Sequence, residues 1–358
     1  MYVPRNPGLP PRALFTPPGG MSGALDCAGL LLFSKARMGI RYALSALGIG
    51  LGETVLAPAY LTGSALAPFD WAGVACALYD VDRTTLAPDW GSVAGVQTRV
   101  KARALLLVHY FGLPCDGGIA RAFCREHGLA LIEDCAHALP PAPGEVGPGA
   151  LGDAAIFSLR KLLPLPDGGA LRLGSGTGAP ACLPPRSDSP VSLAPLLARY
   201  VAQRLGMHRP SRAARPPLPV PDTRPEEPAV GISRWSRWLL SCLDAKAARR
   251  TRRENYRLLM QRVAGIPGLL PLFPELPDGA CPQVLPVLVP AAEQVADSLA
   301  AMGVGAYRWP TLPPRCARAS ETARWLAGRL LALPVHQGLD PVHLEYTADC
   351  LERVLHAR

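Results

Sequence analysis

Three side chains of complementary chemistry follow the ends of two apolar runs near the middle of the chain. Asp134 closes the run LIED, Ser158 ends the run AAIFS, and Lys161 comes three residues later. After five more residues the chain reads Asp-Gly-Gly. An amine can form a Schiff base with an aldehyde, a hydroxyl can bind a phosphate, and a carboxylate can face a ring nitrogen. This layout predicts a site for pyridoxal 5'-phosphate.

Lys161 is the predicted catalytic residue of this site. An amine must lose its proton before it attacks an aldehyde, and burial and a neighbouring cation such as Arg160 favour that loss. Asp134 is predicted to keep the cofactor ring nitrogen protonated, so that the ring accepts electrons. Taken singly, Lys161 could be a surface lysine and Asp134 a helix cap, so the prediction depends on their combination.

Other residues are predicted to bind the cofactor beside these two. Ser158 and the start of a helix at Ala36 are candidate phosphate ligands, since helix N-termini bind anions. Arg37 in the first turn would add a bidentate charge, although a solvated side chain is the alternative. His137, three residues after Asp134, could reach the phenolate oxygen of the cofactor or have a structural role.

Short apolar runs alternate with segments of helical periodicity in the first half of the chain. We expect strands at 54–58, 74–80, 104–109, 129–132, 154–158 and 170–173, and helices at 36–47 and 119–127. Continuous apolar strands are typical of a mostly parallel sheet covered on both faces. Ligands bind such sheets beyond the carboxyl ends of the strands, where His109, Asp134 and Ser158 are expected.

The chain is long enough for two domains. We expect residues 1–230 to form a large cofactor-binding domain and residues 231–358 a smaller one. Residues 174–230 are rich in proline and are expected to form a surface excursion or linker, with one helix that packs on the domain or lies on a membrane or partner. The remaining expected elements are helices at 193–205, 232–264, 291–302 and 317–331, a strand at 283–289 and a terminal helix from 341.

Composition narrows the class of protein. The chain has 358 residues, of which 49% are apolar and 18% charged, so we expect a large core and little disorder. The net charge of +9 comes mostly from scattered arginine, and no nucleic-acid-binding motif accompanies it. A protein that handles phosphorylated ligands is therefore favoured over one that binds nucleic acid.

The ten cysteines form no CxxC pair and no metal-like cluster, so we expect reduced thiols and no metal site. The N-terminus lacks the charged-then-apolar pattern of a signal peptide, and no apolar run reaches the ~18 residues of a membrane span. A cytoplasmic protein without a membrane span is expected.

Several motifs together resemble the DegT/DnrJ/StrS family of sugar aminotransferases. FSLRKLLPLPDGG is similar to that family's Ser…Lys-x5-Glu/Asp-Gly-Gly segment, and LIEDCAHAL to the stretch that supplies the ring-nitrogen acid. ARMGIRYALSALGIGLGETVLAPAY, LVHYFGLPCD and LPVHQGL resemble other family segments. The resemblance implies a fold type I pyridoxal-phosphate-dependent transferase, with a large, mostly parallel sheet and a smaller α+β C-terminal domain.

The resemblance also implies roles for single residues. Lys161 would be the Schiff-base lysine, Asp134 the partner of the ring nitrogen and Ser158 a phosphate ligand. His137 would stand in place of the glutamine that usually lies near the phenolate.

The chain departs from the family pattern at several positions. Ala36 and Arg37 stand where the family has a phosphate-binding Gly-Thr, and the serine-to-lysine spacing is two residues shorter than is common. Tyr60 is the nearest candidate for the aromatic that stacks on the cofactor ring. The stretch that helps to bind a sugar nucleotide has drifted to GISRWSRW, so the cofactor is better supported than the acceptor.

Family members are homodimers that move an amino group, usually from glutamate, to a keto sugar carried on a nucleotide. The resemblance implies the same reaction here, in polysaccharide or secondary-metabolite biosynthesis. Two alternatives stay open. The same cofactor could support a lyase, desulfurase or acyl-transfer reaction, since fold does not fix function. The drifted stretch also suits a degenerate homologue that acts as a scaffold or regulator.

Overall fold

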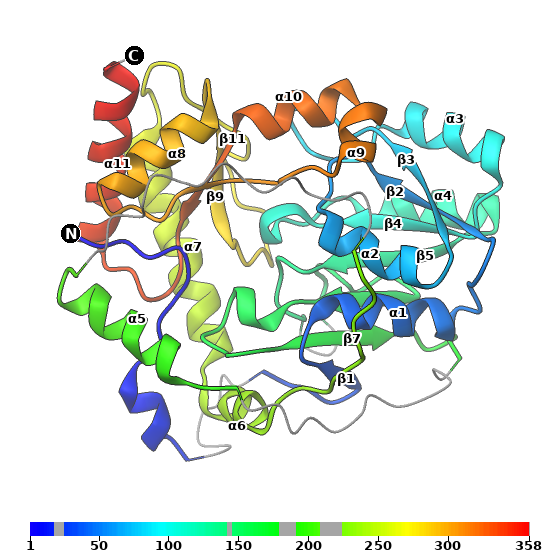
Figure 1. The fold of residues 1–358 in the computed structure, drawn as a ribbon, viewed down its shortest axis with the longest axis horizontal. Coiled ribbons are helices and arrows are strands. Elements are labelled where there is room, and N and C mark those ends of the chain that lie inside the picture. Colours follow the sequence, from blue (N-terminus) through cyan, green and yellow to red (C-terminus); the bar gives the residue numbers. More distant parts are fainter. Residues whose placement is uncertain (18–24, 142–144, 179–190, 208–223, 358) are drawn as a thin grey trace.

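The computed structural model of the chain describes residues 1–17, 25–141, 145–178, 191–207 and 224–357. Its main element is a seven-stranded sheet of order β1-β7-β6-β5-β4-β2-β3 (Figure 1). The strands are β1 (Leu30–Phe33), β2 (Thr54–Pro58), β3 (Ala75–Tyr79), β4 (Ala104–Val108), β5 (Ala130–Cys135), β6 (Ala154–Phe157) and β7 (Gly169–Leu173). Strands β2 to β6 pair in parallel, whereas β7 is antiparallel to both β6 and β1. The expected α/β fold with a mostly parallel sheet is confirmed.

Helices cover the strands of this sheet. Helix α1 (Ala36–Ala46) lies on β6 and β7, α3 (Trp90–Val100) on β2 and β3, and α4 (Gly117–His127) on β4 and β5. Helix α4 begins where the Asp116 carboxylate accepts backbone N–H bonds and ends at Gly128, whose φ is +65°. Helix α2 (Gly63–Trp71), α3 and β1 were not predicted; α2 is apolar on most sides and contains Pro68, so its periodicity is weak.

Two of the expected long helices are wrong. Each is two shorter helices, because a capping residue begins a new helix within the expected range. The helix expected at 232–264 is two helices, α6 (Arg234–Cys242) and α7 (Ala245–Val263), because Asp244 accepts an N–H bond from the first turn of α7 at 2.7 Å. The helix expected at 317–331 is α9 (Pro314–Ala319) and α10 (Glu321–Arg329), because the Ser320 hydroxyl caps α10. Strand β5 runs three residues further than expected and includes Asp134.

A second, antiparallel sheet of order β10-β11-β9-β8 lies in the C-terminal half. Its strands are β8 (Leu270–Pro271), β9 (Val284–Leu288), β10 (Tyr307–Arg308) and β11 (Leu330–Pro334), and helices α8 (Ala292–Ala301) and α11 (Pro341–His356) pack together beside it. The N-terminus lies at this end of the molecule (Figure 1), where Val3 forms a parallel bridge with Val304. The chain then returns through a 3-10 helix, η1 (Pro11–Phe15).

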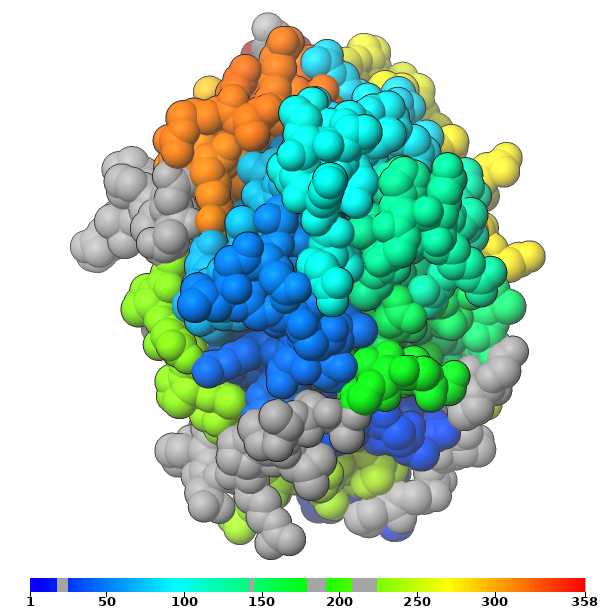
Figure 2. Space-filling view, turned by 90° about the vertical axis from the view of Figure 1, so that its right-hand side faces the viewer, coloured from blue at the N-terminus to red at the C-terminus, as the bar shows by residue number. Residues whose placement is uncertain are grey.

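The C-terminal half also packs on the large sheet. In Figure 2 the orange segment of α9 and α10 lies directly against the cyan segment that carries β3 and α3. A bidentate ion pair joins the two parts, with Arg315 nitrogens 2.7 and 2.8 Å from the Asp70 carboxylate oxygens. The division into domains at residues 230 and 231 stays a prediction.

Of the expected proline-rich excursion, residues 179–190 and 208–223 lie outside the described residues. The helix expected at 193–205 is α5 (Ala194–Arg204). It packs on the N-terminal arm, where the Leu9 N–H donates to the Leu196 carbonyl at 3.0 Å. Among the helices of the described residues, none combines the length and the hydrophobicity that crossing a membrane requires.

Candidate active site

A cavity of about 300 Å³ lies beyond the carboxyl ends of β4, β5 and β6 and beside the start of α1. Six of the seven predicted site residues line this cavity: Ala36, Arg37, Asp134, His137, Ser158 and Lys161. This edge of the sheet is where open α/β proteins bind their ligands. The six residues come from three elements far apart in the sequence, and the fold brings them to one place.

Lys161 ends a short 3-10 helix, η3 (Leu159–Lys161), that follows β6. Its N–H donates to the Ser158 carbonyl at 3.0 Å, and the next carbonyl, that of Leu162, accepts bonds from Arg252 at 2.8 Å and Gln337 at 2.9 Å. Burial lowers the pKa of the Lys161 amine to about 8, with Asp134 opposing the shift. The amine is therefore far easier to deprotonate than an ordinary lysine.

Asp134 is a buried carboxylate at the end of β5. One of its oxygens accepts the Ala136 N–H at 2.9 Å, and its own carbonyl accepts the His109 N–H at 3.0 Å. Burial raises the pKa of Asp134, while the Ala136 N–H and the charge of Lys161 oppose the shift. A cationic group placed against this carboxylate would be stabilised by it.

His137 presents a neutral imidazole to the cavity. Its Nδ1 accepts the Phe111 N–H at 3.1 Å, so the ring hydrogen lies on Nε2 in the neutral tautomer. Burial lowers the pKa of His137 well below its usual value, and the charge of Lys161 adds to the shift. The ring packs between Phe111 and Trp309. His137 can therefore donate a hydrogen bond without carrying a charge.

The N-terminus of α1 offers an anion-binding end. Lys35 is its N-cap residue, no side chain caps the helix, and its first turn has no acidic residue. The carboxylate of Glu227 lies 2.8 Å from the Lys35 amine and 3.3 Å from an Arg37 nitrogen. The Arg37 Nε–H is buried and has no acceptor among the described residues. At this end of the cavity, the hydrogen-bond donors of Lys35, Arg37 and the α1 N-terminus thus outnumber the acceptor oxygens of Glu227.

The Gly-Gly pair after Asp167 allows β7 to approach this helix start. Gly168 has a φ of +147°, which side chains rarely permit. A Cβ on Gly169 would lie 2.3 Å from the Ala36 nitrogen. Asp167 itself binds Ser233 at 2.7 Å and so ties the start of α6 to this turn. The pair therefore sets the position of the α1 N-terminus relative to η3.

Tyr60 does not line the cavity. Its side chain is fully buried, and its hydroxyl donates to the Trp309 carbonyl at 2.7 Å. The aromatic side chain that faces the cavity is Trp309, which was not predicted because it lies in the C-terminal half, far from the motifs. Lys35 and Arg224 also line the cavity and were not predicted. Only the tertiary structure brings Trp309 and Arg224 to the site.

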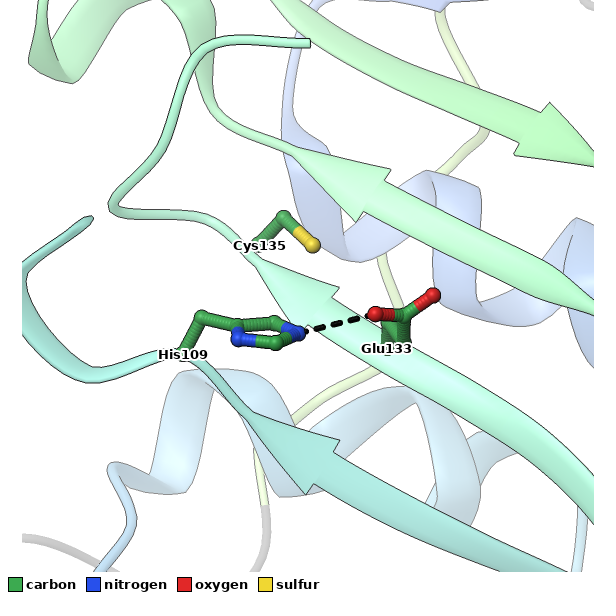
Figure 3. A group of neighbouring side chains, drawn as sticks. All are labelled: His109, Glu133 and Cys135. Carbon is green, nitrogen blue, oxygen red and sulfur yellow. Dashed lines mark hydrogen bonds and ion pairs between the residues drawn. The ribbon is translucent and has the colours of Figure 1, made fainter. Parts of the chain in front are cut away.

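A second polar group lies on β4 and β5, formed by His109, Glu133 and Cys135 (Figure 3). His109 Nδ1 accepts the Cys115 N–H at 3.0 Å, and its Nε2 donates to Glu133 at 2.9 Å, so both ring nitrogens are engaged. Although burial opposes it, the bond from His109 lowers the pKa of Glu133, and burial raises the pKa of Cys135 well above its usual value.

Glu133 also accepts backbone N–H bonds from the loop before β6, including Gly149 at 3.1 Å and Leu151 at 2.9 Å. The Cys135 thiol is protonated, and both nitrogens of the His109 ring are hydrogen-bonded. These side chains therefore suit a structural hydrogen-bond cluster better than a metal site. Because Glu133 and Asp134 are successive strand residues, they point to opposite faces of the sheet. The hydrogen bonds of Glu133 therefore hold β5 in place from the face of the sheet opposite the cavity.

Comparison with known proteins shows what this chain is similar to. Residues 31–183 match the model of the DegT/DnrJ/EryC1/StrS aminotransferase family. The chain is 32% identical over 149 residues to the UDP-N-acetyl-3-dehydro-alpha-D-glucosamine 3-aminotransferase of Acidithiobacillus ferrooxidans, covering 41% of this chain and 39% of that relative. It is 32% identical over 127 residues to the GDP-perosamine synthase of Vibrio cholerae, covering 35% of this chain and 34% of that relative. These matches thus span less than half of either relative.

The fold is shared over a longer stretch. The crystal structure of the aminotransferase TlmJ from Streptoalloteichus hindustanus superimposes with a TM-score of 0.67 at 22% identity, covering 92% of this chain and 86% of that one. The expected fold type I architecture is confirmed by this likeness. The family match covers β2 to β7, β1 except Leu30, and every predicted site residue. The expected resemblance to the DegT/DnrJ/EryC1/StrS aminotransferase family is confirmed over residues 31–183.

Proposed function

We propose that this chain is a pyridoxal 5'-phosphate-dependent aminotransferase that moves an amino group from glutamate to a keto sugar, carried on a nucleotide. The observation that supports this most directly is that Lys161, Asp134, His137 and the α1 N-terminus all line one cavity. The two sequence relatives are named for nucleotide-sugar amination or perosamine synthesis, which favours a sugar as the acceptor. A cytoplasmic homodimer is part of the proposal.

The residues present fit the cofactor. The buried, unpaired Arg37 Nε–H and the uncapped α1 N-terminus would hold its phosphate together with Ser158. Asp134 would hold a protonated ring nitrogen, and His137 would donate to the phenolate oxygen. When bound, the cofactor supplies an electron sink for the substrate carbanion.

Lys161 has two roles in this proposal. Its Nζ would hold the cofactor through the aldehyde, and a pKa of about 8 makes the neutral amine accessible near physiological pH. As a free amine, Nζ would also take a proton from the substrate carbon and return it, since general bases work best with a pKa near the working pH.

The test uses the small number of lysines. The chain has four, at positions 35, 101, 161 and 246, so a covalent cofactor can be located without ambiguity. Protein loaded with pyridoxal 5'-phosphate is reduced with borohydride, digested and mapped by mass spectrometry. We expect the label on Lys161, its loss in Lys161→Ala and its retention in Lys246→Ala.

The same preparation then tests the reaction. Glutamate should convert the loaded protein with release of one 2-oxoglutarate per site, and a keto sugar nucleotide should restore the starting spectrum. Label on another lysine, or none on Lys161, would overturn the cofactor assignment. If Lys161 is labelled but no amino group is exchanged, the cofactor assignment stands and the proposed aminotransferase activity is overturned.

A further inference from the structure

A second cavity, of about 660 Å³, borders the segment that follows Lys161. Leu163 and Pro164 of that segment form part of its wall, and none of the described residues lines both this cavity and the candidate active site. The rest of its wall comes from residues 7–16, 200–204, 242–251 and 337–340, which lie outside the family match at residues 31–183. Small-molecule sites commonly measure about 300–1,000 Å³. The second cavity is therefore large enough for a ligand of its own.

One wall of the second cavity is formed where the N-terminal arm packs on α5. Arg199 of α5 donates to the Pro7 carbonyl at 3.2 Å. A Cβ on Gly8 would lie 2.5 Å from the Tyr200 nitrogen, so only a glycine lets the arm approach α5 this closely. Tyr200, Pro7 and Pro10 line the cavity beside this contact. This wall is thus fixed and largely apolar.

Two glutamine side chains supply polar groups to the same cavity. They are Gln203 of α5 and Gln337 of the loop after β11. The Gln203 amide nitrogen donates to the Gly338 carbonyl, and the Gln337 amide nitrogen donates to the Leu162 carbonyl at 2.9 Å. Each amide nitrogen is therefore held by the backbone, and each amide oxygen remains as an acceptor.

Neither amide oxygen has a donor in the part of the chain that the structure describes. The Gln337 Oε1 is buried without a partner, and no described residue donates to the Oε1 of Gln203, whose side chain is only 7% exposed. Buried acceptors in folded proteins almost always have a donor, from the protein or from an ordered molecule. Two unused acceptors in one cavity therefore favour a ligand with several O–H or N–H donors.

The charged residues of the lining balance one another. Two are cations, Arg12 and Arg204, and two are acids, Asp244 and Asp340. Arg204 pairs with Asp340 at 3.4 Å, and Asp244 accepts the Ala247 N–H at 2.7 Å at the start of α7. This lining has no excess charge to attract an ion. The donors that it favours are thus the hydroxyl groups of a neutral molecule rather than an ammonium group.

We propose that the second cavity binds a neutral mono- or disaccharide. A sugar ring carries hydroxyls at its edge, which can donate to Gln203 and Gln337, and C–H groups on its faces, which can pack on Tyr200 and the prolines beside it. The proposal goes beyond the aminotransferase reaction, since it needs neither the cofactor nor Lys161. Because Gln337 also holds the Leu162 carbonyl, the sugar would contact a side chain that fixes the segment after Lys161.

The probes are three neutral sugars: glucose, N-acetylglucosamine and maltose. Their binding is measured by saturation-transfer NMR and their affinities by titration, with and without pyridoxal 5'-phosphate. We expect at least one of them to bind, with the same affinity in both preparations, because the two cavities have separate linings. Binding that the cofactor abolishes would place the sugar in the active site and overturn the proposal.

Glucosamine and glucose 6-phosphate test the preference for a neutral ligand. We expect both to bind more weakly than the best neutral probe, because the balanced lining does not compensate a ligand charge. Tighter binding of either charged sugar than of every neutral one would overturn the ligand class. No binding of any of the three neutral sugars would overturn the site.

Two variants locate the bound sugar. Gln203→Leu removes one acceptor and should weaken binding about twofold to tenfold, as for the loss of one hydrogen bond. Gln261→Leu, exposed on α7 and outside the cavity, is the matched control and should bind as wild type does. Because Gln203 is buried, a second variant is needed: Ala247→Phe places a ring in the cavity from α7 and should abolish binding.

Unfolding in urea verifies that the variants are folded. Equal affinity in wild type, Gln203→Leu and Ala247→Phe would overturn the second cavity as the binding site, and so would an equal loss in Gln261→Leu. Failure here is distinguishable from failure of the proposed reaction. Sugar binding without a borohydride label on Lys161 leaves this site standing, and a label on Lys161 without sugar binding leaves only the cofactor assignment.

Discussion

The lowered pKa of Lys161 comes from the groups around it, so the titration of this amine is a direct test of the proposed site. Burial, opposed by Asp134 and assisted by Arg160 and Arg5, lowers its pKa to about 8 from 10.5. A lowered lysine pKa means that the neutral amine predominates above pH 8. In cofactor-free protein, acylation of Lys161 measured by peptide mass spectrometry should therefore be half-maximal near pH 8, whereas an ordinary lysine needs about pH 10.4.

Two charge variants should move this midpoint in opposite directions. Asp134→Asn removes the charge that favours the ammonium form, so the midpoint should fall below 8. Arg160→Gln removes a like charge, so it should rise above 8. Arg41→Gln, exposed on α1 and paired with Glu226, should leave it unchanged. A wild-type midpoint near 10, or shifts of the same sign, would contradict this account.

At the residue scale, the sequence could identify side chains that lie just past strand ends. Asp134, His137, Ser158 and Lys161 were predicted on that basis, and all four line one cavity. Their roles in catalysis stay predictions. Tyr60 shows the limit of such predictions, because a position after a strand does not determine whether the side chain points into the cavity or into the core. Residues such as Trp309, Arg224 and Arg5 carry no local signal, since only tertiary contacts bring them near the site.

At the element scale, Gly169 controls the contact between β7 and the start of α1. In Gly169→Ala the new Cβ would lie 2.3 Å from the Ala36 nitrogen, so strand and helix must separate. We expect a loss of about 1–3 kcal/mol in the free energy of unfolding, measured in urea, and weaker binding of inorganic phosphate. Gly176→Ala, with nothing within 4 Å of the new Cβ, should change stability by less than ~0.5 kcal/mol. Equal stability of both variants would refute the close-contact explanation.

The segment from Arg224 to Gly231 supplies an internal anion to the phosphate end of the cavity. Its Glu227 carboxylate binds Lys35 and Arg37, and the segment is fixed by the bond from Trp71 to the Arg224 carbonyl at 2.8 Å. Glu227→Gln should therefore raise the affinity for inorganic phosphate and for pyridoxal 5'-phosphate up to about fivefold, since a competing partially exposed ion pair of up to ~1 kcal/mol is lost.

The neighbouring residue provides the control for this substitution. Glu226 pairs with Arg41, which does not line the cavity, so Glu226→Gln should leave both affinities at the wild-type value. If Glu226→Gln and Glu227→Gln change phosphate binding equally, the effect is one of net charge. In that case Glu227 does not occupy the anion site.

Helices and strands were predictable where the hydrophobic periodicity agreed with the residues that begin or end an element. Helix α4, with an apolar face and Gly128 at its end, was predicted closely, and so were the buried strands. Helices α6 and α7 were merged because both have helical periodicity, and the Asp244 cap between them resembles an ordinary polar position. The antiparallel β7 was predicted as a strand, but its direction depends on β1, which the sequence did not reveal.

At the scale of the whole molecule, Lys161 lies where the two sheets are joined. The Leu162 carbonyl, next to Lys161, accepts bonds from Arg252 of α7 and from Gln337 after β11. Motif resemblance was sufficient to predict the overall architecture, because it covers both halves of the chain. It could not predict this junction, since Arg252 looks like any other arginine of a charged helix.

Arg252 is the central residue of that junction. It is 1% exposed, and its guanidinium donates to the carbonyls of Leu162 at 2.8 Å, Gln283 at 3.0 Å and Pro282 at 3.2 Å. Burial lowers its pKa to about 10, so it stays charged at neutral pH. Its partners are backbone carbonyls and not a carboxylate, so an apolar replacement leaves buried acceptors without donors.

Arg252→Met should therefore lower the free energy of unfolding by about 3 kcal/mol or more, since each charge-assisted bond contributes about 1.5–3 kcal/mol. Arg250→Gln, two positions earlier on the exposed side of α7, should stay within ~0.5 kcal/mol of wild type. Urea unfolding measures both. Because the Leu162 carbonyl would lose one of its two donors, cofactor attachment at Lys161 should also slow in the Arg252 variant and not in the control. Equal stability of the two variants would show that Gln337 and packing alone hold the lysine between the sheets.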